Sequence, residues 1–258
     1  MPPPSPSVIS PPEPLREEPR LTLAEHLEEL RRRLGISLAA LLIAAWVSFT
    51  QVERVIDWLQ RPAEGLLPRL AFFSPTEPLI AYVKVAVLAG LLLSMPVILA
   101  QLWGFVRTGL TPQERSYGAV FIGWGSVQFL GGAAFAYYVM LPVSLRFLLG
   151  IGQRVLEPVI SIGRYLSFVT TVVLWCGLVF ELPVVLFLLA KVGIVTPEWL
   201  RQQRSYAILV LVIIAALVTP TTDPVNLLLM TVPLVALYEL SIVITRFAMP
   251  QQPHRGHG

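Results

Sequence analysis

The sequence contains few of the residues on which catalytic sites and disulfide frameworks are built. It has one cysteine, Cys176, and three histidines, His26, His254 and His257. A single thiol cannot form a disulfide within the chain, and Cys176 lies in an apolar run, where it should act as a small buried hydrophobic residue. There is no Ser-His pair, HExxH, GxSxG or phosphate-binding loop. We therefore expect no enzyme activity, no metal and no cofactor.

Charge is also scarce. Asp, Glu, Lys and Arg make up 14% of the 258 residues, whereas 55% are hydrophobic. A soluble domain carries about a quarter charged residues. The net charge of +3 does not indicate nucleic-acid binding, because the basic residues flank apolar runs and form no continuous patch. The composition predicts an all-α membrane protein that does not bind nucleic acid.

The N-terminal segment lacks the apolar stretch of a cleavable signal peptide. Its first 19 residues include eight prolines, a composition typical of an extended, disordered tail. We expect three parts: a disordered Pro-rich tail at 1–20, a six-helix membrane domain at 21–247, and a C-terminal tail at 248–258.

Six apolar runs are candidate membrane spans. A helix needs about 20 residues to cross the hydrocarbon core. The last two runs are shorter, because Ser205–Val218 ends before a Thr-Pro break and Val225–Tyr238 ends before Glu239. We predict that both helices are short and locally thin the bilayer. The six spans fall at 33–50, 79–106, 116–141, 165–190, 205–219 and 225–245.

The distribution of basic residues predicts the orientation. With the N-terminus in the cytoplasm, twelve of the 19 Lys and Arg residues fall in inside segments and six in outside segments, and Lys84 lies within the second span. The excess of inside charge places both termini in the cytoplasm. The outside connections are then 51–77, where short helices are expected, and 142–164.

Glu181 is the one acidic residue well inside a long span. Pro183 follows it and should break the helix near Val179. An acid in hydrocarbon is either hydrogen-bonded structurally or functional, and we favour function. A proton-coupled small-molecule transporter could use Glu181 as a relay, but it predicts internal repeats that the sequence lacks. A pure scaffold or insertase-like protein is a further alternative.

Two segments predicted to be cytoplasmic carry acidic residues near helix starts. Residues 23–34 form an amphipathic pattern in which Glu28 and Glu29 can pair with Arg32 and Arg33 at i+4. An interfacial helix anchored by arginines is the simpler interpretation from the residues alone. Glu114, at the third position of a helix that Thr111-Pro112 would start, could act only as a cap.

Nine short motifs, in order, resemble the TatC family across about residues 22–247. A single motif would be weak, but nine in the family's order across six spans are specific. The motifs are His26–Arg31 (HLEELR), Phe73–Pro78 (FSPTEP), Pro96–Phe105 (PVILAQLWGF), Gly109–Glu114 (GLTPQE), Phe135–Pro142 (FAYYVMLP), Tyr165–Phe168 (YLSF), Phe180–Pro183 (FELP), Thr219–Asp223 (TPTTD) and Leu237–Leu240 (LYEL).

The resemblance implies a concave, glove-like six-helix fold in the bacterial inner membrane. It implies a receptor that binds twin-arginine signal peptides at its cytoplasmic face and works, as an oligomeric complex with TatB and TatA, to export folded proteins using the proton-motive force. The family's signal-binding glutamates fall on Glu29 and Glu114, with Arg31 beside the first. Each carboxylate could accept two hydrogen bonds from one guanidinium, which lysine cannot provide.

Other positions of the family also have counterparts. The intramembrane glutamate falls on Glu181, the external proline on Pro62, and the acid at the outer end of the last span on Asp223, where an acid before Pro224 also suits a helix N-cap. One departure is Leu227, which stands where many relatives have a glutamine. The adjacent Asn226 is the candidate substitute for that polar contact with a partner.

Overall fold

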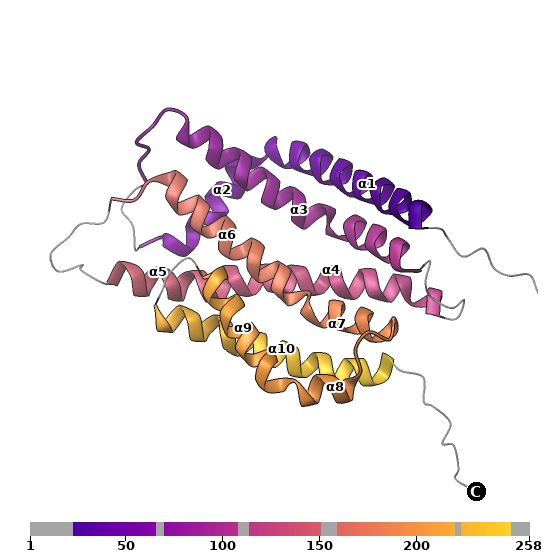
Figure 1. Cartoon of the computed structure of the whole chain (residues 1–258). Coiled ribbons are helices and arrows are strands. Elements are labelled where there is room, and N and C mark those ends of the chain that lie inside the picture. Colours follow the sequence, from indigo (N-terminus) through magenta and orange to yellow (C-terminus); the bar gives the residue numbers. More distant parts are fainter. Residues whose placement is uncertain (1–22, 66–69, 108–113, 151–158, 220–222, 249–258) are drawn as a thin grey trace, which may run out of the picture.

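The computed structural model describes residues 23–65, 70–107, 114–150, 159–219 and 223–248, which fold as an all-α bundle (Figure 1). An isolated bridge joins Ala71 to Ser161, and no strand forms within these ranges. The 1–20 tail, and the 248–258 tail beyond Ala248, lie outside the described residues. The helices are α1 (Leu23–Phe49), α2 (Val52–Gln60), η1 (Arg61–Ala63), α3 (Glu77–Val106), η3 (Glu114–Tyr117), α4 (Gly118–Phe135), η4 (Ala136–Met140), α5 (Leu141–Gly150), α6 (Ile162–Phe180), α7 (Leu182–Lys191), α8 (Pro197–Gln202), α9 (Arg204–Val218) and α10 (Pro224–Ala248).

These elements confirm the predicted multi-pass architecture. Five segments are long and apolar enough to cross a membrane, and α9 is a shorter apolar helix. The third span joins α4 to α5 through the π-helical turn η4, and the fourth joins α6 to α7. The start of α1 and the end of α10 lie at one end of the bundle, which we call the terminal end (Figure 1). The short helices α2 and η1 lie at the opposite end, which we call the α2 end.

The first two spans pack through small residues. A Cβ atom added at Gly90 of α3 would lie 2.5 Å from the backbone nitrogen of Ala45 in α1. Side-chain rotation cannot relieve a clash with backbone, so Gly90 permits the close approach of the two helices. Small residues serve this purpose widely in membrane helix packing, where there is no hydrophobic driving force between helices.

Gly90→Val should therefore separate α1 from α3 and destabilise the protein by about 1–3 kcal/mol, the usual cost of overpacking. The midpoint of thermal unfolding in detergent should fall. Gly123→Val is the matched control, because nothing lies within 4 Å of a Cβ atom at Gly123 in α4. Equal midpoints for the two variants would show that the α1–α3 contact does not need glycine.

The α2 end is closed by a cap, as predicted for residues 51–77. Two tyrosines in the spans hold α2 by donating to its backbone carbonyls. The Tyr137 hydroxyl donates to the Trp58 oxygen at 2.7 Å, and the Tyr165 hydroxyl donates to the Leu59 oxygen at 2.8 Å. The rings of Tyr137 and Trp58 also stack, with centroids 3.8 Å apart. The cap is thus fixed to the third and fourth spans.

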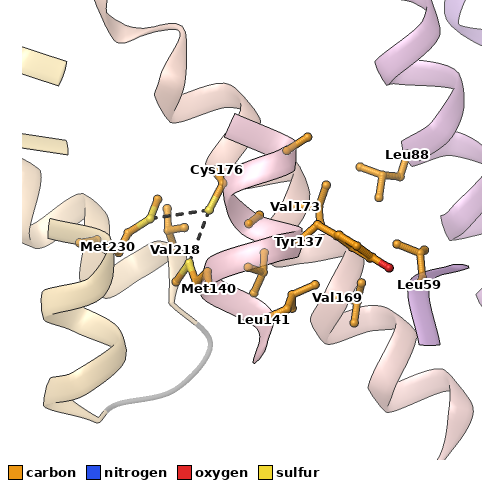
Figure 2. Packing of buried hydrophobic residues seen from close by; sticks show 14 of the residues in the cluster. Leu59, Leu88, Tyr137, Met140, Leu141, Val169, Val173, Cys176, Val218 and Met230 are labelled. Atoms are coloured by element: carbon orange, nitrogen blue, oxygen red, sulfur yellow. Dashed lines mark hydrogen bonds between the residues drawn. The ribbon is translucent and has the colours of Figure 1, made fainter. Parts of the chain in front are cut away.

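The structure confirms the prediction that Cys176 is a small buried hydrophobic residue. It is fully buried, and its sulfur lies 3.5 Å from that of Met140 and 3.7 Å from that of Met230. Figure 2 shows this sulfur cluster where η4, α6 and α10 meet, beside the larger apolar core around Tyr137. Its surroundings are those of a packed thiol that joins three spans.

The prediction of two short final helices is half right. Helix α9 has 15 residues, about 22 Å at 1.5 Å per residue, which is less than the hydrocarbon core of about 30 Å. The α10 prediction is wrong, because α10 has 25 residues and continues past Glu239. Glutamate is a good helix former, and the charge of Glu239 is paired with Arg204 of α9 at 2.5 Å. Local thinning of the bilayer beside α9 stays a prediction.

Helix α10 is also tied to the corner between α8 and α9. The Tyr238 hydroxyl donates to the Leu200 oxygen at 2.7 Å, one residue before the Glu239–Arg204 pair. The remaining residues of α10 extend beyond the start of α9, where Leu240 and Ile244 line an apolar pocket shared with α4 and α7. These contacts explain why α10 extends beyond α9.

Candidate functional site

Glu29 lies near the terminal end of α1 and is held by a neighbouring arginine. Arg33 donates to its Oε1 atom from Nε at 2.7 Å, and Arg33 Nη2 lies 2.5 Å from the same oxygen. The two side chains are only 27% and 19% exposed. This confirms the predicted i+4 pair. Within the described residues, Oε2 of Glu29 has no hydrogen-bond donor and could accept one from a ligand.

Gly104 of α3 makes room for this ion pair. A Cβ atom at Gly104 would overlap the Arg33 guanidinium, lying 2.5 Å from Cζ. The guanidinium therefore rests on the α3 backbone and holds Glu29 beside that helix. The sequence did not reveal this contact, because Gly104 and Arg33 are distant in the chain.

Gly104→Ala should displace Arg33 and free the Glu29 carboxylate, with little effect on folding because a flexible side chain can move away. We expect several-fold weaker binding of whatever ligand Glu29 holds, since its carboxylate would lose its fixed position. Gly35→Ala on α1, with nothing within 4 Å of the added Cβ atom, is the control. The probe is a peptide with two adjacent arginines, the ligand that the family resemblance implies. Its affinity for the two variants is compared by fluorescence anisotropy, and unchanged affinity in Gly104→Ala would contradict this role.

Glu114 begins η3, in the connection between α3 and α4, at the same terminal end (Figure 1). Its side chain, like Thr111 and Pro112, lies outside the described part of the structure. The described residues next to it are firmly packed: the Trp103 ring of α3 covers Gly118 and lies 4.9 Å from the Phe121 ring, centroid to centroid. Adjacent residues of α3, Trp103 and Gly104, thus fix the elements that carry Glu114 and Glu29.

The other cations near Glu29 are arranged differently. Arg31 is exposed and stands two positions from Glu29, so the two side chains leave the helix in different directions. The second predicted i+4 pair, Glu28 with Arg32, does not form, and both residues are exposed. Arg33 is the arginine that the structure places on Glu29, and Arg31 remains available at the surface.

Glu181 lies at the break between α6 and α7, as Pro183 predicted. It is 6% exposed and faces inward, where a Cβ atom at Gly125 of α4 would be 3.3 Å from its Oε2 atom. Neither carboxyl oxygen has a hydrogen-bond partner among the described residues, and Oε1 of Gln128, also in α4, has none. A buried polar atom without a hydrogen-bond partner lowers stability by about 1–3 kcal/mol. A polar partner that donates to the Glu181 carboxyl group would therefore be stabilising.

The polar residues at the start of α10 have partners within the chain. Asp223 caps the helix as predicted, accepting from the Asn226 backbone nitrogen at 2.8 Å. The Asn226 side chain donates to Asp223 Oδ2 at 2.8 Å and accepts from the Ser144 hydroxyl at 2.6 Å. Asn226 is 1% exposed. A contact of Asn226 with a partner protein stays a prediction, and it would require these bonds to open.

Pro62 lies far from Glu29, in η1 at the α2 end, half-buried. The structure therefore separates the predicted site residues into three places. Glu29, Arg31 and the backbone of Glu114 lie at the terminal end, Glu181 lies inside the bundle, and Pro62, Asp223 and Asn226 lie toward the α2 end.

The fold and these polar positions define a multi-pass helical membrane protein, in whose described part no group of His, Cys, Asp and Glu could hold a metal. The model of one family, described as Sec-independent protein translocase protein (TatC), matches residues 25–233. The chain belongs to the TatC family, and it is a component of a protein translocase and not an enzyme.

Individual relatives agree with this assignment. The TatC protein of Carboxydothermus hydrogenoformans is 39% identical over 236 residues, covering 92% of this chain and 97% of that protein. That of Aquifex aeolicus is 39% identical over 233 residues, covering 88% and 96%. A crystal structure of a twin-arginine translocase receptor, TatC, has a TM-score of 0.76 at 38% identity and covers 87% of this chain and 99% of that one. The glove-like fold is confirmed, and a small-molecule transporter is not favoured.

Proposed function

We propose that this chain is the receptor subunit of a twin-arginine translocase and binds the signal peptide at the terminal end of its bundle. The observation that carries the proposal is the positioning of two acidic elements by adjacent residues of α3. Gly104 supports the Arg33–Glu29 pair, and Trp103 packs on the start of α4 just after Glu114. Two carboxylates at one end of the bundle suit two guanidinium groups.

The terminal end then faces the bacterial cytoplasm, with the protein in the inner membrane. The excess of basic residues in the segments at this end supports the orientation. Binding at the membrane surface also limits the desolvation cost of an ion pair, because water still reaches part of each group. Folded cargo would be exported to the other side, with the proton-motive force as energy source.

The same proposal includes partners in an oligomeric receptor complex. TatB and TatA are single-span proteins, and a polar residue in such a span needs a hydrogen-bonding partner within the membrane. The unpartnered carboxyl group of Glu181 could supply it. Because Glu181 is nearly buried against α4, a partner helix would reach it only by opening the contact between α4 and the α6–α7 break.

Glu181→Ala should weaken association with TatA or TatB while leaving the fold intact, because the carboxyl group makes no hydrogen bond with the described residues. Native gel electrophoresis of the solubilised complexes measures this association. Gln128→Leu, which removes a second unpartnered polar group on the facing helix α4, shows whether any change in this region has the same effect. Complexes of normal size and amount in Glu181→Ala would count against the assigned contact.

An export assay in the protein's own host tests the function as a whole. The gene is deleted and replaced by the wild-type chain, and a fluorescent protein that folds before export carries a twin-arginine signal. We expect the fluorescence to reach the outside only with the wild-type chain present. Export that persists after deletion, with no other copy of the gene, would contradict the receptor role.

A further inference from the structure

A groove of about 1030 Å³ lies between the first turns of α3 and α6, at the α2 end of the bundle. It is far from Glu29 and is not used by the proposed signal-peptide site. Gly163 brings its two walls together, because a Cβ atom there would lie 2.5 Å from Cγ of Glu77. The residues on which the argument depends are Glu77, Ile80, Lys84, Arg164, Ser167 and Phe168.

Two cations of the groove have unused hydrogen-bond donors. The exposed Arg164 side chain makes no hydrogen bond or ion pair with the described residues, and its backbone nitrogen donates to Ser161. Lys84 Nζ donates to the Ser167 hydroxyl at 2.7 Å, which leaves two of its three donors. Ser167 stands three positions after Arg164, on the same face of α6. Lys84 therefore lies about one helical turn from Arg164.

Among the described residues, one carboxylate lines the groove, and it is already engaged. Glu77 accepts hydrogen bonds from the Ser161 hydroxyl and from the Phe73 backbone nitrogen, the latter at 2.8 Å. Its charge is thus directed into the junction between α3 and α6 rather than toward Lys84 and Arg164. The described residues that line the groove carry a net positive charge of one, from two cations and one anion, and they are complementary to a single anionic group.

The groove combines charged and apolar side chains along its length. Lys84 follows Glu77 by seven residues, or about 10 Å of helix, so it begins below the end of α3 and can extend its ammonium group toward the surface. Apolar side chains stand beside the two cations: Ile80 is exposed and Phe168 is half-buried, while the hydroxyl groups of Ser167 and Thr171 also line the groove. An amphiphile with an anionic head and a hydrocarbon tail matches this combination of groups.

We propose that this groove binds an anionic phospholipid. Its phosphate lies between Lys84 and Arg164, where charge-assisted hydrogen bonds form, and an acyl chain lies along Ile80 and Phe168. Basic pockets between membrane helices bind lipid head groups on the same principle. In the proposed orientation the lipid belongs to the outer leaflet. Bound there, it would join α3 to α6.

Native mass spectrometry of the full-length protein in detergent tests the proposal, with phosphatidylglycerol and phosphatidylcholine added in parallel. The wild type should retain phosphatidylglycerol preferentially, and the Lys84→Gln/Arg164→Gln double variant should retain it at least tenfold less, for the loss of two charge-assisted hydrogen bonds. Arg146→Gln, an exposed cation of α5 that does not line the groove, should behave as the wild type.

The single variant Arg164→Gln keeps the test decisive if the double variant does not fold, because no hydrogen bond of the described residues depends on the Arg164 side chain. It should lose several-fold in retention. Equal retention by wild type and Arg164→Gln, or equal retention of the two lipids, would overturn the proposal. Inorganic phosphate that competes fully with phosphatidylglycerol would show a phosphate site and not a lipid site.

Discussion

Replacing Glu29 and Glu114 together by alanine should abolish binding of a twin-arginine signal peptide while the protein still inserts and folds. The open Oε2 atom of Glu29 and the Glu114 carboxylate would each lose a charge-assisted hydrogen bond to the peptide. Such hydrogen bonds contribute about 1.5–3 kcal/mol, so each single variant should bind roughly 10- to 100-fold more weakly. Crosslinking of a labelled signal peptide to solubilised protein measures the loss.

Matched variants separate this effect from a general change of surface charge. Glu28→Ala removes an exposed acid next to Glu29 that makes no ion pair with the described residues, and it should bind normally. Glu29→Gln keeps the size of the side chain and one acceptor oxygen, and it should retain part of the affinity. If Glu29→Ala and Glu28→Ala lost the same amount, net charge rather than a positioned carboxylate would be responsible.

Changing both arginines of the signal peptide to lysine should have an effect of similar size on the unaltered protein. A guanidinium presents two parallel donors to one carboxylate, whereas an ammonium group is a point donor. Losing the directed hydrogen bonds of both guanidinium groups should weaken binding at least tenfold at constant net charge. Isothermal titration with the two peptides gives the ratio directly. A ratio near one would favour a scaffold or insertase-like role, for which the distinction between the two cations is irrelevant.

Local patterns in the sequence were sufficient for much of the fold. Apolar runs of about 20 residues located the spans, because a helix in lipid must satisfy its backbone within itself. Pro183 located the break after α6, and Asp223 before Pro224 located an N-cap. These features depend on residues close together in the chain, so the residues that cause them can be recognised in the sequence.

Features that depend on distant residues were missed. The sixth span was placed correctly at 225–245, but it was predicted to be too short because Glu239 interrupts its apolar run. The charge of Glu239 is paired with Arg204 of α9. No local sequence pattern predicts the Arg204–Glu239 ion pair, because the two residues are distant in the chain. The support that Gly104 gives to Arg33, and the bond from Ser144 to Asn226, are of the same kind.

In the candidate site, too, local contacts were predicted from the sequence and contacts between distant residues were not. The i+4 spacing predicted the Glu29–Arg33 pair, which formed, and the Glu28–Arg32 pair, which did not. The difference is tertiary, since the first pair rests on α3 and the second points away into an exposed surface where such pairs contribute little. A role of Glu114 in binding rests on the family resemblance and on the location of η3 at the terminal end.

The most direct test of the account is to find what one signal peptide touches. A photoreactive residue placed beside the arginine pair of the peptide is activated on the full-length protein, and the attached segments are identified by mass spectrometry. We predict attachment both to residues 23–34 and to residues 107–117, lost in competition with an unlabelled twin-arginine peptide. Attachment to α2 and η1 at the other end of the bundle, or to neither segment, would contradict the claim that the terminal end is the receptor surface.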